Sequence, residues 1–133
     1  MPLEPNVKEK HSLKALIKSF AFARNGIVTA LKMERNLKVH YLIAIIVMLT
    51  GAYFKISQVE AMILIIIIVL VISLEMVNTA IERTIDLLTE KEHVYARIAK
   101  DVAAGAVLTA VIAAVIIGII IFLPYVKAIN EII

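Results

Sequence analysis

The sequence predicts an all-α membrane protein, with an N-terminal amphipathic surface helix followed by three transmembrane helices. The composition is 62% apolar and only 19% charged, against about 45 to 50% and about 25% in soluble domains. The apolar residues also gather in segments close to the roughly 20 residues that a spanning helix needs. A length of 133 residues allows one domain, so we expect a single membrane domain over 1–133.

The predicted surface helix covers about residues 12–38. Ser12 is a suitable N-cap, and apolar side chains follow at near-helical spacing, while Lys14, Lys18 and Lys32 take the opposite face. An anionic membrane surface attracts such a face, at about 1 kcal/mol for each nearby basic residue. Membrane anchoring is the simpler interpretation, and a contribution to a binding site is the alternative.

The predicted transmembrane helices cover about residues 40–56, 59–88 and 99–126. Of the fourteen Lys and Arg residues, twelve lie in the N-terminal region or in and beside the loop from Thr89 to Ala99. Only Lys55 and Lys127 lie on the other side. By the positive-inside rule, the N-terminus and this loop are expected in the cytoplasm and the C-terminus outside.

Small residues recur every fourth position in the third predicted transmembrane helix, at Ala106, Ala110, Ala114 and Gly118. Such stripes let helix backbones approach closely in lipid, and close approach of a ligand is the alternative interpretation. Three helices are few to enclose a site, so we expect copies of the chain to associate.

A polar stripe lies near the end of the second predicted transmembrane helix, on one helical face. Its members are Glu75, Asn78, Thr79, Glu82 and Asp86. Carboxylates in the membrane centre cost about 2.5 to 3.5 kcal/mol each, so the stripe must face protein, water or a cation. At about 1.5 Å per residue from Val59, Glu75 lies roughly 24 Å along the helix, just inside a hydrocarbon core about 30 Å thick.

A second polar cluster opens the third transmembrane segment, where Lys100 and Asp101 precede the small residues 103–105. An ammonium group beside carboxylates suits a phosphate that is also held by a metal. Alternatively, Lys100 anchors the helix end at the membrane boundary. The four glycines fit neither a P-loop nor a dinucleotide fingerprint. The basic N-terminus has few aromatics, so a membrane is favoured over nucleic acid as its partner.

These motifs resemble the prokaryotic diacylglycerol kinase and undecaprenol kinase family of small integral-membrane lipid kinases. The run from Glu75 to Glu82, with Asp86, resembles its central signature, and residues 98–108 resemble its second. Glu34 matches the family's N-terminal glutamate, although its residue type alone also fits a surface ion pair with Arg35 or Lys38. The resemblance covers about residues 18–122.

The resemblance implies a homotrimer with shared active sites in the bacterial cytoplasmic (inner) membrane, which phosphorylates a lipid alcohol with ATP and Mg²⁺. By this resemblance, Glu75 is the general base and Asn78 orients the reacting groups, while Glu34 and Glu82 hold the metal. The implied lipid contacts are Glu75, Asn78 and Ala104. The implied nucleotide contacts are Glu34, Glu82, Lys91, Glu92, His93, Lys100 and Asp101. Ala15 stands where many relatives have an arginine, so Lys14 or Lys18 is expected to substitute.

The preferred substrate is undecaprenol, with diacylglycerol as the alternative. The stretch 103–106 and the Asn78-Thr79 pair resemble undecaprenol kinases of Gram-positive bacteria, whereas some diacylglycerol kinases carry serine at the position of Ala104. An ion-conducting or transport subunit would also use Glu75 as an intramembrane carboxylate, but it would not need Lys100 and Asp101. A purely structural oligomer would explain the small-residue stripe without explaining three acids on one helical face.

Overall fold

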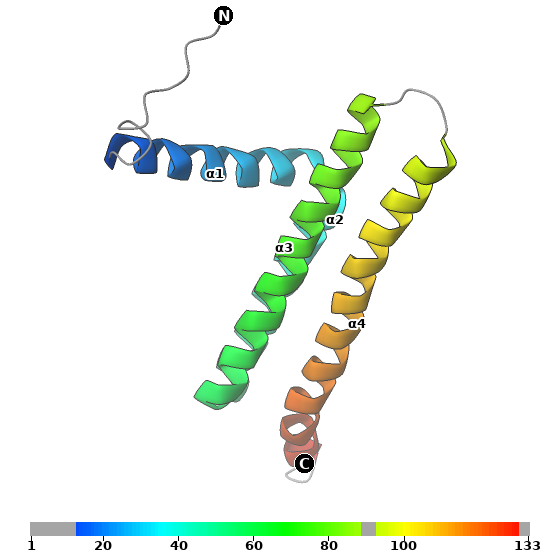
Figure 1. The fold of residues 1–133 in the computed structure, drawn as a ribbon. Helices are drawn as coiled ribbons and strands as arrows, with labels where there is room; N and C mark the ends of the chain where they lie inside the picture. The colour runs from blue at the N-terminus through cyan, green and yellow to red at the C-terminus, as the bar shows by residue number, and fades with distance from the viewer. Residues whose placement is uncertain (1–12, 89–92, 131–133) are drawn as a thin grey trace, which may run out of the picture. The chain divides into compact units, whose positions relative to one another are not determined.

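The residues that the computed structural model describes, 13–88 and 93–130, form four α-helices, and only residues 34, 55–57 and 93 among them are not helical. Helix α1 (Leu13–Met33) belongs to one compact unit, and a second unit contains α2 (Arg35–Phe54), α3 (Gln58–Leu88) and α4 (Val94–Asn130) (Figure 1). Each helix of the second unit is long and apolar enough to cross a membrane. The predicted all-α membrane class and the three candidate spans are therefore confirmed.

The predicted surface helix over 12–38 differs from the structure at its end. Glu34 has an extended backbone, with φ −99° and ψ 121°, so α1 stops at Met33 and residues 35–38 already belong to α2. The hydrophobic spacing could not show this interruption because it continues on both sides of Glu34. The proposed cap, Ser12, lies outside the described residues, and the position of α1 on a membrane surface stays a prediction.

A three-residue link joins α2 to α3 at what we call the Lys55 end of the second unit. Lys55 ends α2 in the left-handed conformation, with φ 53° and ψ 47°. The Ile56 N–H then donates to the Gly51 carbonyl at 3.1 Å. The Glu60 carboxylate accepts the Ser57 N–H at 2.8 Å, and the Ser57 hydroxyl accepts the Glu60 N–H at 3.3 Å. This reciprocal capping box fixes the start of α3.

Helix α3 is the centre of the second unit because it packs against both α2 and α4. One face of α3 is buried, at positions three or four residues apart: Leu64, Ile67, Val71, Glu75 and Asn78. Facing positions of α4 are also buried, among them Ala103, Val107, Ala110 and Ile121. The buried face of α3 is thus apolar toward the Lys55 end and polar toward the opposite end, which we call the Asp86 end.

Helix α4 is longer than the predicted span of 99–126, because it begins at Val94 and continues to Asn130. Hydropathy marks the part of a helix that crosses the membrane, and a helix can continue into the polar layers beyond it. Of the predicted small-residue stripe, Ala110 is buried, Ala114 and Gly118 are half-buried, and Ala106 is exposed. The stripe therefore packs within the chain only in part.

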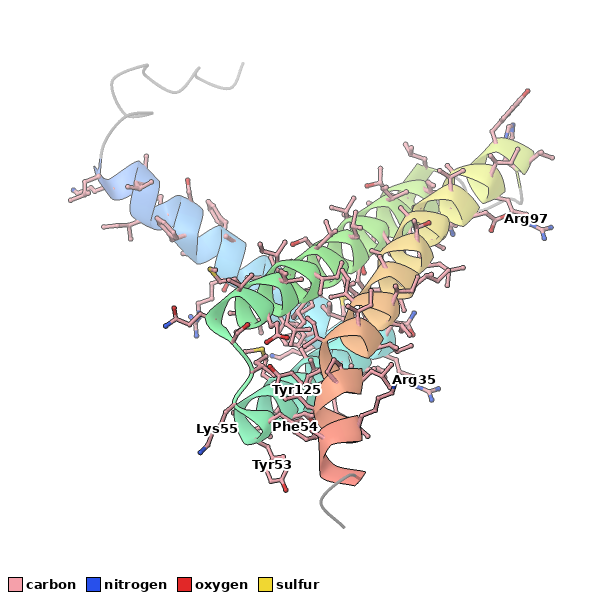
Figure 2. The ribbon with its side chains drawn as sticks, turned by 90° about the horizontal axis from the view of Figure 1, so that it is seen from below. Arg35, Tyr53, Phe54, Lys55, Arg97 and Tyr125 are labelled. Atoms are coloured by element: carbon pink, nitrogen blue, oxygen red, sulfur yellow. The ribbon has the colours of Figure 1, made fainter. Side chains whose placement is uncertain are left out.

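An aromatic and polar cluster joins all three helices at the Lys55 end (Figure 2). The Phe54 ring of α2 lies 5.9 Å from the Tyr125 ring and 6.2 Å from the Phe122 ring of α4, measured between centroids. The Tyr125 hydroxyl donates to the Glu60 carboxylate of α3 at 2.8 Å. Glu60 thus takes part in contacts at the Lys55 end, whereas Glu75 lies further along the same helix on its buried face.

Candidate functional site

Glu75 and Asn78 occupy the buried face of α3 where its apolar residues end. Only 4% of Glu75 and 8% of Asn78 is exposed. Among the residues that the structure describes, no hydrogen bond or ion pair joins the Glu75 carboxylate to another side chain. Burying a carboxylate without a partner is costly, in lipid as in a protein interior. Packing alone therefore does not account for this residue, and a polar ligand would.

Asn78 connects this buried pair to Glu82, one turn further along α3. The Asn78 Nδ2 donates to the Glu82 carboxylate at 3.0 Å, whereas the Asn78 Oδ1 is buried and has no hydrogen-bond partner. A buried acceptor without a partner costs about 1 to 3 kcal/mol. The Asn78 oxygen is therefore available for a hydroxyl donor or a cation.

Glu34 reaches the same part of α3 from the break before α2. Its carboxylate lies 2.9 Å from the Arg83 guanidinium, with 21% of the Glu34 side chain and 51% of the Arg83 side chain exposed. Because Arg83 directly follows Glu82, this contact places Glu34 and Glu82 at the same end of the unit. The exposed pair contributes at most about 1 kcal/mol to stability, so its main effect is to position Glu34.

Lys100 connects the start of α4 to the polar face of α3. Its ammonium group lies 2.5 Å from the Asp86 carboxylate. Asp101 instead pairs with Arg97 of its own helix, at 3.8 Å and in an exposed position. The structure thus joins Lys100, but not Asp101, to the acidic end of α3.

Of the remaining predicted site residues, the structure describes His93 and Ala104. His93 is exposed, its ring is 5.6 Å from that of Tyr95, and its Nδ1 accepts the Tyr95 N–H at 3.3 Å. Lys91 and Glu92 lie outside the described residues. Ala104 is exposed, whereas its neighbour Ala103 is buried in the chain. A contact of Ala104 with a ligand therefore stays a prediction.

The oxygen atoms of the site suit Mg²⁺, although the chain does not form a complete metal cage. Over 13–88 and 93–130, no three acidic or histidine side chains gather closely enough to hold an ion by themselves. Mg²⁺ prefers oxygen ligands, keeps several waters and commonly takes its other ligands from substrate phosphates. The Glu82 carboxylate and the unpartnered Asn78 oxygen fit such partial coordination, with Glu34 held at the same end.

Sequence reasoning missed Arg83 because it is 49 residues away from its partner Glu34 in the chain. The Arg83 position next to Glu82 was the available signal, since a basic residue beside a polar stripe can bind a distant acid. The hydrogen-bond partner of Glu60, Tyr125, was missed for the same reason, because it is 65 residues away in the chain.

Comparisons with known proteins place the chain in a family. The family profile described as prokaryotic diacylglycerol kinase matches residues 21–122. The chain is 43% identical over 115 residues to an undecaprenol kinase of Bacillus subtilis. The matched region covers 86% of this chain and 94% of that protein. It is 38% identical over 110 residues to a diacylglycerol kinase of Synechocystis. That matched region covers 82% of this chain and 63% of that protein. The chain therefore belongs to the prokaryotic diacylglycerol kinase family and is a lipid kinase of the inner membrane.

Proposed function

We propose that the chain transfers the γ-phosphoryl group of ATP to the hydroxyl of undecaprenol, in a magnesium-dependent reaction at the cytoplasmic membrane surface. The burial of Glu75 and Asn78 at the end of the apolar face of α3 is the observation that supports this most directly. A lipid alcohol has a polar hydroxyl attached to an apolar tail, and this part of α3 changes from apolar to polar in the same direction.

In the proposed reaction, Glu75 accepts the proton of the lipid hydroxyl as its oxygen attacks the γ-phosphorus. A base must lie within hydrogen-bond reach of that proton, and a carboxylate with no other partner is free to do so. The Asn78 side chain orients the reacting groups, with its Nδ2 held by Glu82 and its Oδ1 available to the ligand.

Glu34 and Glu82 are the proposed ligands of Mg²⁺, which would neutralise charge on the ATP phosphates. Phosphoryl transfer depends mainly on positioning and charge neutralisation, so a few polar groups at helix ends are sufficient. Lys100 supplies a further positive charge at the same end, where its ammonium group contacts the Asp86 carboxylate. Asp101, Lys91, Glu92 and His93 are proposed to complete the nucleotide site.

The choice of undecaprenol over diacylglycerol is supported by the two relatives. Identity is 43% to the undecaprenol kinase, over most of both proteins, and 38% to the diacylglycerol kinase. We further propose that the Asp86 end faces the cytoplasm, together with the N-terminus, and that three copies assemble with shared sites. Exposed small residues of α4, such as Ala106, are available for that assembly.

Purified protein in lipid nanodiscs tests this proposal. With Mg²⁺ and γ-labelled ATP, we expect label in undecaprenol, weaker labelling of diacylglycerol, and none without Mg²⁺. Preferential labelling of diacylglycerol would reverse the substrate assignment. Ion flux through protein-containing vesicles with no labelled lipid would instead support the ion-conducting alternative, in which Glu75 marks an ion path.

A further inference from the structure

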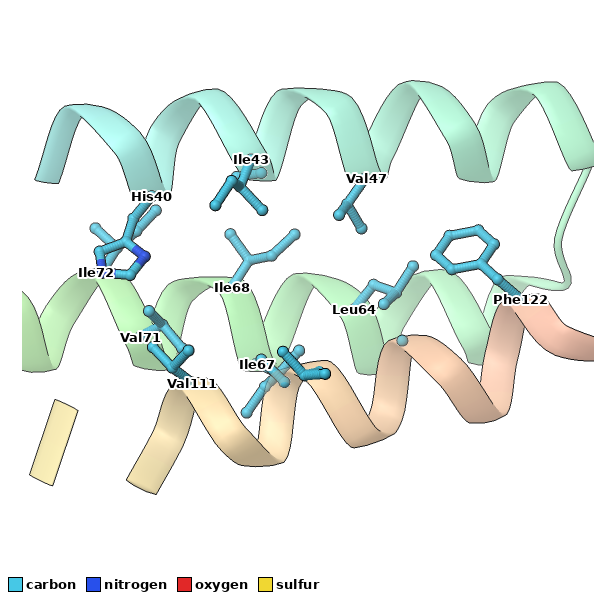
Figure 3. A pocket seen from close by; sticks show the side chains of 14 residues that line it. His40, Ile43, Val47, Leu64, Ile67, Ile68, Val71, Ile72, Val111 and Phe122 are labelled. Carbon is cyan, nitrogen blue, oxygen red and sulfur yellow. The ribbon is translucent and has the colours of Figure 1, made fainter. Parts of the chain in front are cut away.

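An apolar cavity of about 240 Å³ lies between α2, α3 and α4 (Figure 3). Its walls are almost entirely aliphatic, and His40 is the one polar side chain among the described residues that line it. His40 and Ile72 lie at one end of the cavity and Phe122 lies at the other (Figure 3). The cavity therefore extends along the helix axes rather than across them.

The cavity ends one helical turn before the buried polar pair. Leu64, Ile67 and Val71 line it, and the same buried face of α3 continues to Glu75 and Asn78. At about 1.5 Å per residue, Val71 is roughly 6 Å and Leu64 roughly 16 Å from Glu75 along α3. An apolar chain attached to a hydroxyl at Glu75 could thus enter the cavity directly.

Two of the residues of α4 that line the cavity are small, and they leave space in it. Ala114 and Gly118 line it, and a Cβ atom added at Gly118 would meet no atom within 4 Å. An apolar cavity of roughly 150 Å³ in another protein stays dry and takes up benzene, so a cavity of this size and lining favours hydrocarbon over water. Its natural occupant is an apolar chain.

We propose that this cavity binds the head-proximal part of the hydrocarbon tail of the substrate. The kcat/KM for a lipid alcohol therefore depends on its tail length until the tail fills the cavity. This inference rests on the proposed function, because Glu75 must hold the hydroxyl for the tail to point into the cavity. The tail enters beside His40, passes Val71 and ends its bound portion near Phe122, and the rest of a long polyprenyl chain continues in the membrane. Recognition of the tail is thereby separate from recognition of the hydroxyl.

The test compares isoprenoid alcohols of two, three, four and eleven isoprene units with the intact protein in detergent micelles. For the unsubstituted protein, kcat/KM should rise with tail length until the cavity is filled and then level off. Gly118→Leu and Val47→Phe, which fill the cavity from two different helices, should lower kcat/KM about tenfold for the longer alcohols. They should leave the shortest alcohol and the KM for ATP unchanged. Ile119→Phe adds bulk at an exposed position outside the cavity and serves as the matched control.

Each other outcome overturns the inference. Equal kcat/KM for the long alcohols in all variants would mean that the tail runs outside the cavity. The same loss at every tail length, or a changed oligomer mass, would make the cavity a packing surface for another copy of the chain. No phosphorylation of any alcohol by the unsubstituted protein would overturn the proposed function and this inference together.

Discussion

Replacing Glu75 with Gln is the sharpest test of the proposed chemistry, because the change keeps shape and removes only the proton acceptor. Glu75 is 4% exposed, and its carboxylate has no side-chain partner among the described residues, so the amide breaks no existing contact. A general base contributes about 10² to 10⁴ in rate. Since each factor of ten is about 1.4 kcal/mol in the barrier, we expect a loss of about 2.7 to 5.5 kcal/mol of transition-state stabilisation.

The thermal stability of Glu75→Gln should not fall with its activity. A buried carboxylate is costlier than an amide, so the unfolding temperature should be equal or higher. Turnover with undecaprenol, binding of a nonhydrolysable ATP analogue and thermal unfolding would be measured on one preparation. Glu60→Gln is the matched control, because Glu60 lies on the same helix at the Lys55 end, and its turnover should match wild type. Activity of Glu75→Gln within a few fold of wild type would exclude Glu75 as the base. Loss of ATP binding would instead indicate that Glu75 belongs to the nucleotide site.

Three further predictions concern the metal, the Lys55 end and the topology. Glu34→Gln and Glu82→Gln should each raise the Mg²⁺ concentration for half-maximal activity by roughly tenfold or more, since each removes an anionic oxygen ligand; unchanged titrations would make both of them ordinary surface acids. Tyr125→Phe removes the hydrogen bond to Glu60, so the unfolding temperature should fall while turnover is retained below the melting range; an unchanged unfolding temperature would show that this bond does not stabilise the fold. A reporter fused after Ile133 should be active only outside the cytoplasm, and cytoplasmic activity would contradict the proposed orientation.

The sequence predicted the features that depend on membrane physics. Three spans follow from hydropathy, and the importance of Glu75 and Asn78 follows from the cost of polar groups in lipid. The structure buries both residues on the central helix, and their roles in catalysis stay a prediction. The helix ends were less predictable. Glu34 interrupts an otherwise continuous helical pattern, and α4 continues past the apolar segment.

Contacts between distant parts of the chain could not be predicted from local patterns. The pairing of Glu34 with Arg83 depends on how α2 meets α3, and several acids were available to each basic residue. The cavity beside Gly118 depends on side chains from three helices failing to fill a common space. Spacing within one helix carries no information about either.

The short link between α2 and α3 also has a consequence for biogenesis. Three residues separate the two helices, and hydrogen bonds close the turn on both sides, so neither helix can be placed in the bilayer far from the other. Insertion of α2 and α3 as one helical hairpin would carry the single ammonium group of Lys55 across the membrane. The polar stripe of α3 would then stay on the side of synthesis. Helix α4 would insert afterwards and pack against the α2–α3 hairpin already in the bilayer.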